Sequence, residues 1–86
     1  MSHAIGILEV SSIAAGFEAE DAMLKAAEIE ALVARTICSG KFLIVVGGSV
    51  SAVSAALDAG KTQAAGFLIE SLNIPNIDPQ VFTAIS

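Results

Sequence analysis

The stretch Ala34-Arg-Thr-Ile-Cys-Ser-Gly-Lys-Phe-Leu-Ile-Val-Val46 decides how the rest of the chain can be arranged. Its centre is the sequence Cys38-Ser39-Gly40, and a Ser-Gly pair is typical of a tight turn. The flanking segments 34–37 and 42–46 have the composition of β-strands, so the stretch predicts a β-hairpin. The unbroken apolar run 42–46 is typical of a central strand that is covered on both faces.

Upstream of this hairpin, the sequence predicts a strand followed by a long helix. Residues 4–10 are rich in Ile, Leu and Val, as strands are, and Ser11 and Ser12 can cap a helix that runs from 13 to 33. This helix would carry two apolar stripes, because two sets of residues recur at helical spacing. One set is Ala15, Ala19, Ala22, Ala26, Ile29 and Val33, and the other is Ile13, Phe17, Leu24 and Ala31. One stripe can pack on the sheet of its own chain, so the second predicts contact with a neighbouring subunit.

Downstream of the hairpin, Gly47-Gly48 ends the central strand, and Ser49 or Ser51 can cap a second helix. The apolar positions of this helix, again at helical spacing, are Val50, Val53, Leu57, Gly60, Ala64 and Phe67. Residues 68–72 then predict a fourth strand.

The C-terminal part of the chain completes the expected topology. Residues 73–76 resemble a turn, and Asp78-Pro79 suits the start of a short helix over 79–85. The predicted order is β-α-β-β-α-β, which is the split βαβ arrangement of the ferredoxin-like α+β class, with an antiparallel sheet and both long helices on one face. The length predicts a single domain over residues 1–86.

Composition excludes several classes of function. The formal net charge is −5, without a basic patch and without Trp or Tyr, which argues against nucleic-acid binding. The longest apolar run, 42–46, is far shorter than the ~20 residues that a membrane span requires. The start has no secretory pattern, so we expect a cytoplasmic protein. Charged residues make up 15% of the chain, below the roughly 25% of typical soluble domains, so we expect apolar surface to be buried between subunits.

The residues also argue against an enzyme. The one histidine, His3, lies near the N-terminus, and no glycine-rich phosphate loop is present. Cys38 is either a small buried side chain or a functional thiol, and the nearby Lys41 would favour its thiolate. Iron–sulfur clusters are held by several thiolates, whereas this chain has one cysteine. Metal binding at Cys38 would therefore need several chains around a symmetry axis.

The sequence resembles the shell proteins of bacterial microcompartments over nearly its whole length. The segments that carry the resemblance are 4–9, 20–27, 36–42, 47–53 and 74–76. The resemblance implies a cyclic hexamer, shaped as a flat tile that joins other shell proteins in the wall of a cytoplasmic organelle. It implies a central pore lined by Cys38, Ser39 and Gly40, and a tile edge that includes Lys25. Asn76 stands where the family often has a basic residue at this edge, which implies weaker contacts between tiles.

Within this family, the segments around Cys38 and Asn76 are similar to the first half of the tandem-domain shell proteins of propanediol-utilisation compartments. That similarity implies an electron conduit in which three copies of the pore cysteine hold one [4Fe–4S] cluster on the axis, and Cys38 matches this cysteine. A hexamer of the present chain would instead bring six copies of Cys38 to the axis. The alternative function is a small ferredoxin-like trimeric protein that senses a ligand between its subunits, and the native mass distinguishes the two.

Overall fold

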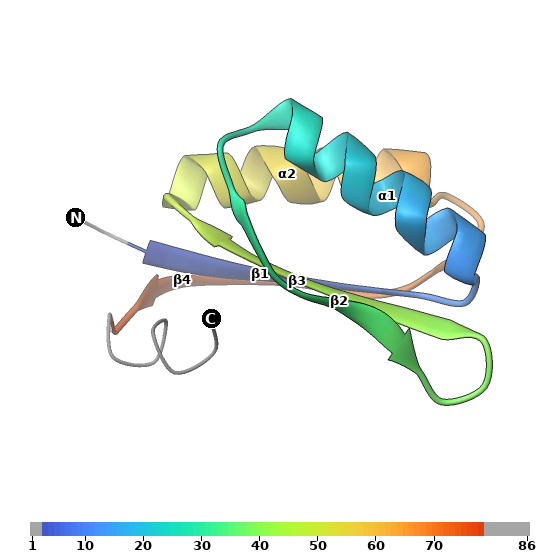
Figure 1. Cartoon of the computed structure of the whole chain (residues 1–86). Coiled ribbons are helices and arrows are strands. Elements are labelled where there is room, and N and C mark those ends of the chain that lie inside the picture. Colours follow the sequence, from blue (N-terminus) through green and yellow to red (C-terminus); the bar gives the residue numbers. More distant parts are fainter. Residues whose placement is uncertain (1–2, 79–86) are drawn as a thin grey trace.

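The computed structural model describes residues 3–78 and confirms the predicted order of elements. These are β1 (His3–Val10), α1 (Ile13–Ala26), β2 (Glu30–Ile37), β3 (Lys41–Gly48), α2 (Val50–Gln63) and β4 (Leu68–Ile77). The strands form one sheet in the order β2-β3-β1-β4, and every neighbouring pair is antiparallel. Both helices lie on the same face of this sheet (Figure 1). Neither helix is long and apolar enough to cross a lipid bilayer, and residues 3–78 contain no other α-helix.

The end of α1 is the largest correction to the sequence-based expectation. The Ser12 hydroxyl accepts a hydrogen bond from the Ala15 amide at 3.2 Å and caps the helix as expected. The helix then ends at Ala26 instead of Val33, and residues 30–37 form β2. The apolar spacing of this segment fits a helix, but backbone pairing with β3 and the preference of β-branched side chains for strands prevail. The expected stripes are therefore cut short, and Ala31 and Val33 belong to the sheet.

The C-terminal half of the chain needs two further corrections. The helix α2 is capped by Ser49, whose hydroxyl accepts from the Ala52 amide at 3.2 Å, but it ends at Gln63, so Phe67 lies in the following turn. The expected turn at 73–76 is part of β4, because this strand stays paired with β1 until Ile77 meets His3. An edge strand tolerates a proline there. The helix expected over 79–85 lies outside the described residues.

The core lies between the helices and the sheet. Its largest fully buried side chains are Leu8, Met23, Ile44, Val10, Val46 and Val53. Met23 belongs to neither expected stripe of α1, yet it fills the space above the sheet, where a Cβ at Gly60 would lie 2.7 Å from its sulfur. At Gly16 a Cβ would lie 2.4 Å from Cδ2 of Phe42. These two glycines therefore let both helices approach the core closely.

Candidate functional site

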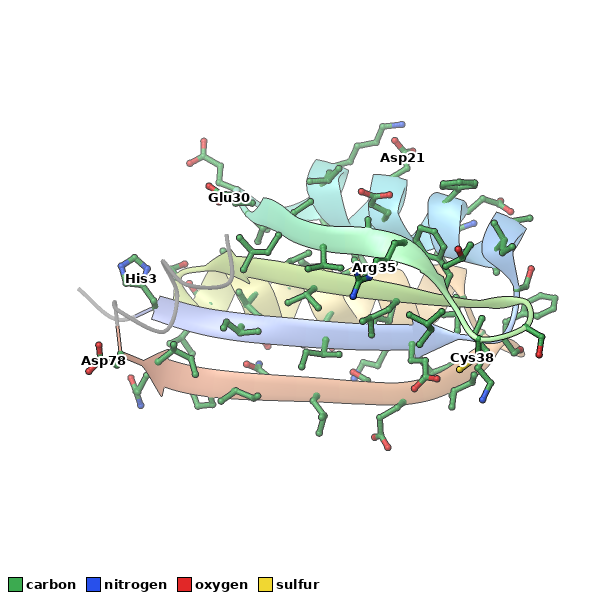
Figure 2. The ribbon with its side chains drawn as sticks, turned by 60° about the horizontal axis from the view of Figure 1, so that its bottom comes forward. His3, Asp21, Glu30, Arg35, Cys38 and Asp78 are labelled. Carbon is green, nitrogen blue, oxygen red and sulfur yellow. The ribbon has the colours of Figure 1, made fainter. Side chains whose placement is uncertain are left out.

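The turn between β2 and β3 forms the tip of a hairpin at one end of the sheet. The last backbone pair of this hairpin joins Ile37 to Lys41, and Cys38, Ser39 and Gly40 lie beyond it, all exposed. Figure 2 shows Cys38 at the opposite end of the sheet from His3 and Asp78. The predicted hairpin is confirmed, and its tip projects from the protein.

The backbone of the turn is unusual at Cys38. This residue has a φ of 48°, in the left-handed region, while Gly40 has a φ of 81° and no atom within 4 Å of the position of a Cβ. A side chain other than glycine in the left-handed region costs about 1 kcal/mol or more. The thiol of Cys38 is free and exposed. Of the two alternatives for Cys38, burial within its own chain is therefore wrong.

A single chain supplies too few ligands for a metal centre at this turn. Among residues 3–78, no group of three or more histidine, cysteine or acidic side chains is placed to hold a metal ion. An exposed thiol at a projecting tip is, however, suited to meet copies of itself around an axis. The site fits an iron–sulfur cluster only as a centre that several chains share.

Lys25 lies on the last turn of α1, away from the hairpin tip. Its Nζ lies 2.8 Å from Oδ2 of Asp21, and their side chains are 77% and 63% exposed. The Asp21 carboxylate, through its hydrogen bond and then through its charge, raises the pKa of Lys25 above the ordinary value. The lysine is thus a charged group on an exposed helix surface.

Asn76 lies near the far end of β4, and within residues 3–78 it is the second residue besides glycine with a positive φ, at 58°. The strand begins with Leu68, which pairs with Val10 near the hairpin end, and it ends at Ile77 beside His3. At about 3.3 Å per residue, Asn76 lies roughly 26 Å from Leu68 along the strand. The structure therefore places Asn76 and the Cys38 turn at opposite ends of the sheet, and it does not bring Cys38, Lys25 and Asn76 together.

Sequence reasoning did not single out a row of side chains that crosses the uncovered face of the sheet. Arg35 pairs with Leu43, Leu43 with Glu9, and Glu9 with Glu70, so the four residues share one row from edge to edge. Figure 2 shows Arg35 on this face. These residues are aligned by the order and register of the strands. The sequence itself indicates only which residues of each strand share a face, through the alternation of side chains.

Comparisons with known proteins agree on one family. The sequence profile described as BMC domain matches residues 4–77. The chain is similar to the bacterial microcompartment shell protein PduT of Citrobacter freundii, with 55% identity over 86 residues, which cover 100% of this chain and 47% of PduT. It is also similar to the shell protein PduA of the same organism, with 41% identity over 61 residues, or 71% of this chain and 66% of PduA.

A solved structure gives the same result. The fold matches a microcompartments protein from Desulfitobacterium hafniense DCB with a TM-score of 0.94 and 48% identity, over 96% of this chain and 46% of that chain. The present chain thus spans about half the length of PduT and of the Desulfitobacterium protein.

Proposed function

Because this chain belongs to the BMC domain family of bacterial microcompartment shell proteins, we propose that it forms a shell tile by closing into a cyclic hexamer around its β2–β3 turns. One observation carries the proposal: the exposed turn 38–40 projects from one end of the sheet, with Cys38 at its start. Six such tips at an axis form a pore, while the strands extend outward from it. The tile is located in the wall of a microcompartment and joins other shell proteins there.

The lining of the pore follows from the residues of the turn. Ser39 offers a hydroxyl that donates and accepts hydrogen bonds, and Gly40 has no side chain, while a Cβ at its position would meet open space. Solutes at the axis therefore meet small polar groups and backbone amides. This lining suits passage of small polar metabolites when the axis is open.

Cys38 gives the pore its second proposed role, as the holder of a [4Fe–4S] cluster. When bound, the cluster supplies one-electron transfer between the two sides of the wall. Each chain contributes one thiol, which would have to lose its proton and become a thiolate to act as a ligand. A [4Fe–4S] cluster usually takes about four cysteine ligands, so a ring of six copies offers enough thiols and leaves some of them free.

Native mass spectrometry of the anaerobically purified 86-residue chain tests the proposal, because it reports ring size and bound iron together. The expected result is a six-chain assembly that carries one [4Fe–4S] cluster. A three-chain assembly without iron would favour a ligand-sensing trimer instead. A monomer at high protein concentration would overturn the ring, and a six-chain assembly without iron would leave a pore that conducts solutes only.

The proposed tile edge predicts the effect of Lys25→Ala. The exposed ammonium of Lys25 is available to a neighbouring tile, so its loss should leave six-chain rings intact and weaken their joining into sheets. Electron microscopy of sheets assembled from equal amounts of protein measures this effect. Lys61→Ala is the matched control, since Lys61 also lies near the end of a helix and pairs with an acidic residue one turn earlier. Sheets of Lys25→Ala as extensive as those of the control would contradict the edge assignment.

A further inference from the structure

The large apolar side chains that the described residues leave exposed fall in only two segments. Their exposed fractions range from 38% to 60%. The α1 surface consists of Ile13, Phe17 and Leu24, and the β4 surface consists of Phe67, Leu68, Ile69, Leu72 and Ile74. Monomeric proteins rarely expose apolar patches beyond a few hundred Å². Among the described residues of this 86-residue chain, eight exposed large apolar side chains in two segments favour contacts with partners at both.

The α1 surface faces away from α2. Glu18, on the other flank of α1, accepts a hydrogen bond from Nε2 of Gln63 in α2 at 3.4 Å, which shows where the second helix lies. Phe17 packs against Phe42 of β3, with ring centroids 5.1 Å apart, and still keeps 60% of its surface exposed. α1 contacts β1, β2 and β3, whereas α2 contacts chiefly β1 and β4, so α1 and this surface lie nearer the edge strand β2.

The β4 surface lies on the other side of the protein. β4 is the opposite edge strand of the sheet. Leu72 pairs with Ile7, and Ile74 pairs with Ile5, while Gly6, between these two β1 residues, faces α2. Because side chains alternate along a strand, Leu72 and Ile74 lie on the face without helices. The two surfaces thus lie on opposite sides of one protomer.

Charges on the two edge strands complement each other at the same position along the sheet. Arg35 on β2 and Glu70 on β4 are the two ends of the row that crosses the sheet. They are separated by three strand spacings, about 14 Å, which is too far for a pair within the chain. Glu70 lies directly opposite Glu9, and like charges in this position destabilise a sheet. Within residues 3–78, none of these three groups has an ion-pair partner.

A closed ring joins two different surfaces of each subunit, one to each neighbour. We propose that the α1 surface and the β2 edge of one protomer meet the β4 surface of a second copy, with Arg35 of one chain paired to Glu70 of the next. This inference rests on the proposed ring. With the hairpin tips at the axis, equal positions along the strands lie at equal radius, so Arg35 and the Glu70 of the neighbouring copy meet at the same level. Arg35 of the neighbouring copy then provides a positive charge next to the two carboxylates of Glu9 and Glu70, which have no cationic partner among the described residues of their own chain.

Charge reversal tests the contact with the full chain. Arg35→Glu and Glu70→Arg each place like charges at every contact, so each variant alone should shift from six-chain rings to single chains in native mass spectra. The double variant Arg35→Glu/Glu70→Arg restores opposite charges and should restore rings. An equal mixture of the two single variants should form rings of three copies of each, because only unlike neighbours then attract. Lys61→Glu on α2 is the control for net charge and should keep its rings.

The apolar part of the contact is tested by Leu72→Glu, at a residue that is 48% exposed in the single chain. It should also give single chains, with far-ultraviolet circular dichroism like that of the unsubstituted protein. Rings that persist in this variant, or single reversals that do not alter the rings, would overturn the contact. Single variants that fail to combine in the mixture would overturn it as well. An unsubstituted chain without rings would instead overturn the proposed function itself.

Discussion

Cys38→Ser should produce rings of unchanged size that contain no iron and lack the brown colour of an iron–sulfur protein. Serine matches cysteine in shape, and Cys38 is exposed, so we expect the stability of the fold to change by less than about 0.5 kcal/mol. The hydroxyl of serine does not replace a thiolate as a cluster ligand. Because this chain has no other cysteine, every ligand of this type is lost in one substitution.

Iron analysis and native mass of anaerobically purified protein measure this prediction. Ser39→Ala is the matched control, since it alters the adjacent residue of the same turn and keeps the thiol. It should retain the cluster. Iron content that is equal in Cys38→Ser and in the unsubstituted protein would show that Cys38 does not hold the metal.

Leu8→Ala should cause the largest loss of stability among single truncations of the core. Leu8 is fully buried, and its Cδ2 lies close to α2, 3.0 Å from where a Cβ at Gly60 would be. Truncating such a leucine removes packed methyl groups and leaves a cavity, at a cost of about 2–5 kcal/mol. The total stability of a chain of this length is about 4–13 kcal/mol, so this one change removes a large part of it.

Thermal unfolding at one fixed protein concentration measures this effect, because assembly adds stability that depends on concentration. For a domain of this size, each kcal/mol lowers Tm by about 4–8 °C. Leu43→Ala is the control, since it makes the same chemical change at a half-buried position, and it should cost about 1 kcal/mol. Equal losses of Tm in the two variants would show that the core is not centred on Leu8.

The parts of the fold that depend on local signals could be predicted from the sequence. A Ser-Gly turn between apolar segments defines a hairpin by itself, and serines before each helix define where α1 and α2 begin. The end of α1 could not be predicted in this way. The residues after Ala26 keep a helical period, and only their pairing with β3 turns residues 30–37 into a strand. Met23 was missed because its burial depends on Gly60 of the other helix.

In the candidate site, too, features that depend on neighbouring residues could be predicted, and features that depend on strand order could not. The turn at Cys38 could be predicted because it depends only on neighbouring residues. That a metal centre there needs several chains follows from the presence of one cysteine in the sequence. The complementarity of Arg35 and Glu70 could not be predicted, because the two residues are joined only through the order and register of all the strands. The order of the strands in a sheet is not determined by patterns among residues that are close in the sequence.

The pairing of His3 with Ile77 has a consequence for how such subunits can be duplicated. It places the beginning of β1 and the end of β4 about 5 Å apart, at the end of the sheet away from the Cys38 turn. In the proposed ring, a tether between two neighbouring copies would therefore join them on the side away from the axis. Relatives of about twice this length are consistent with such a fusion. If the proposed six-chain ring were built from such fused pairs, its turns would form two independent sets of three, and mutation could keep the sulfur in one set while it is replaced in the other.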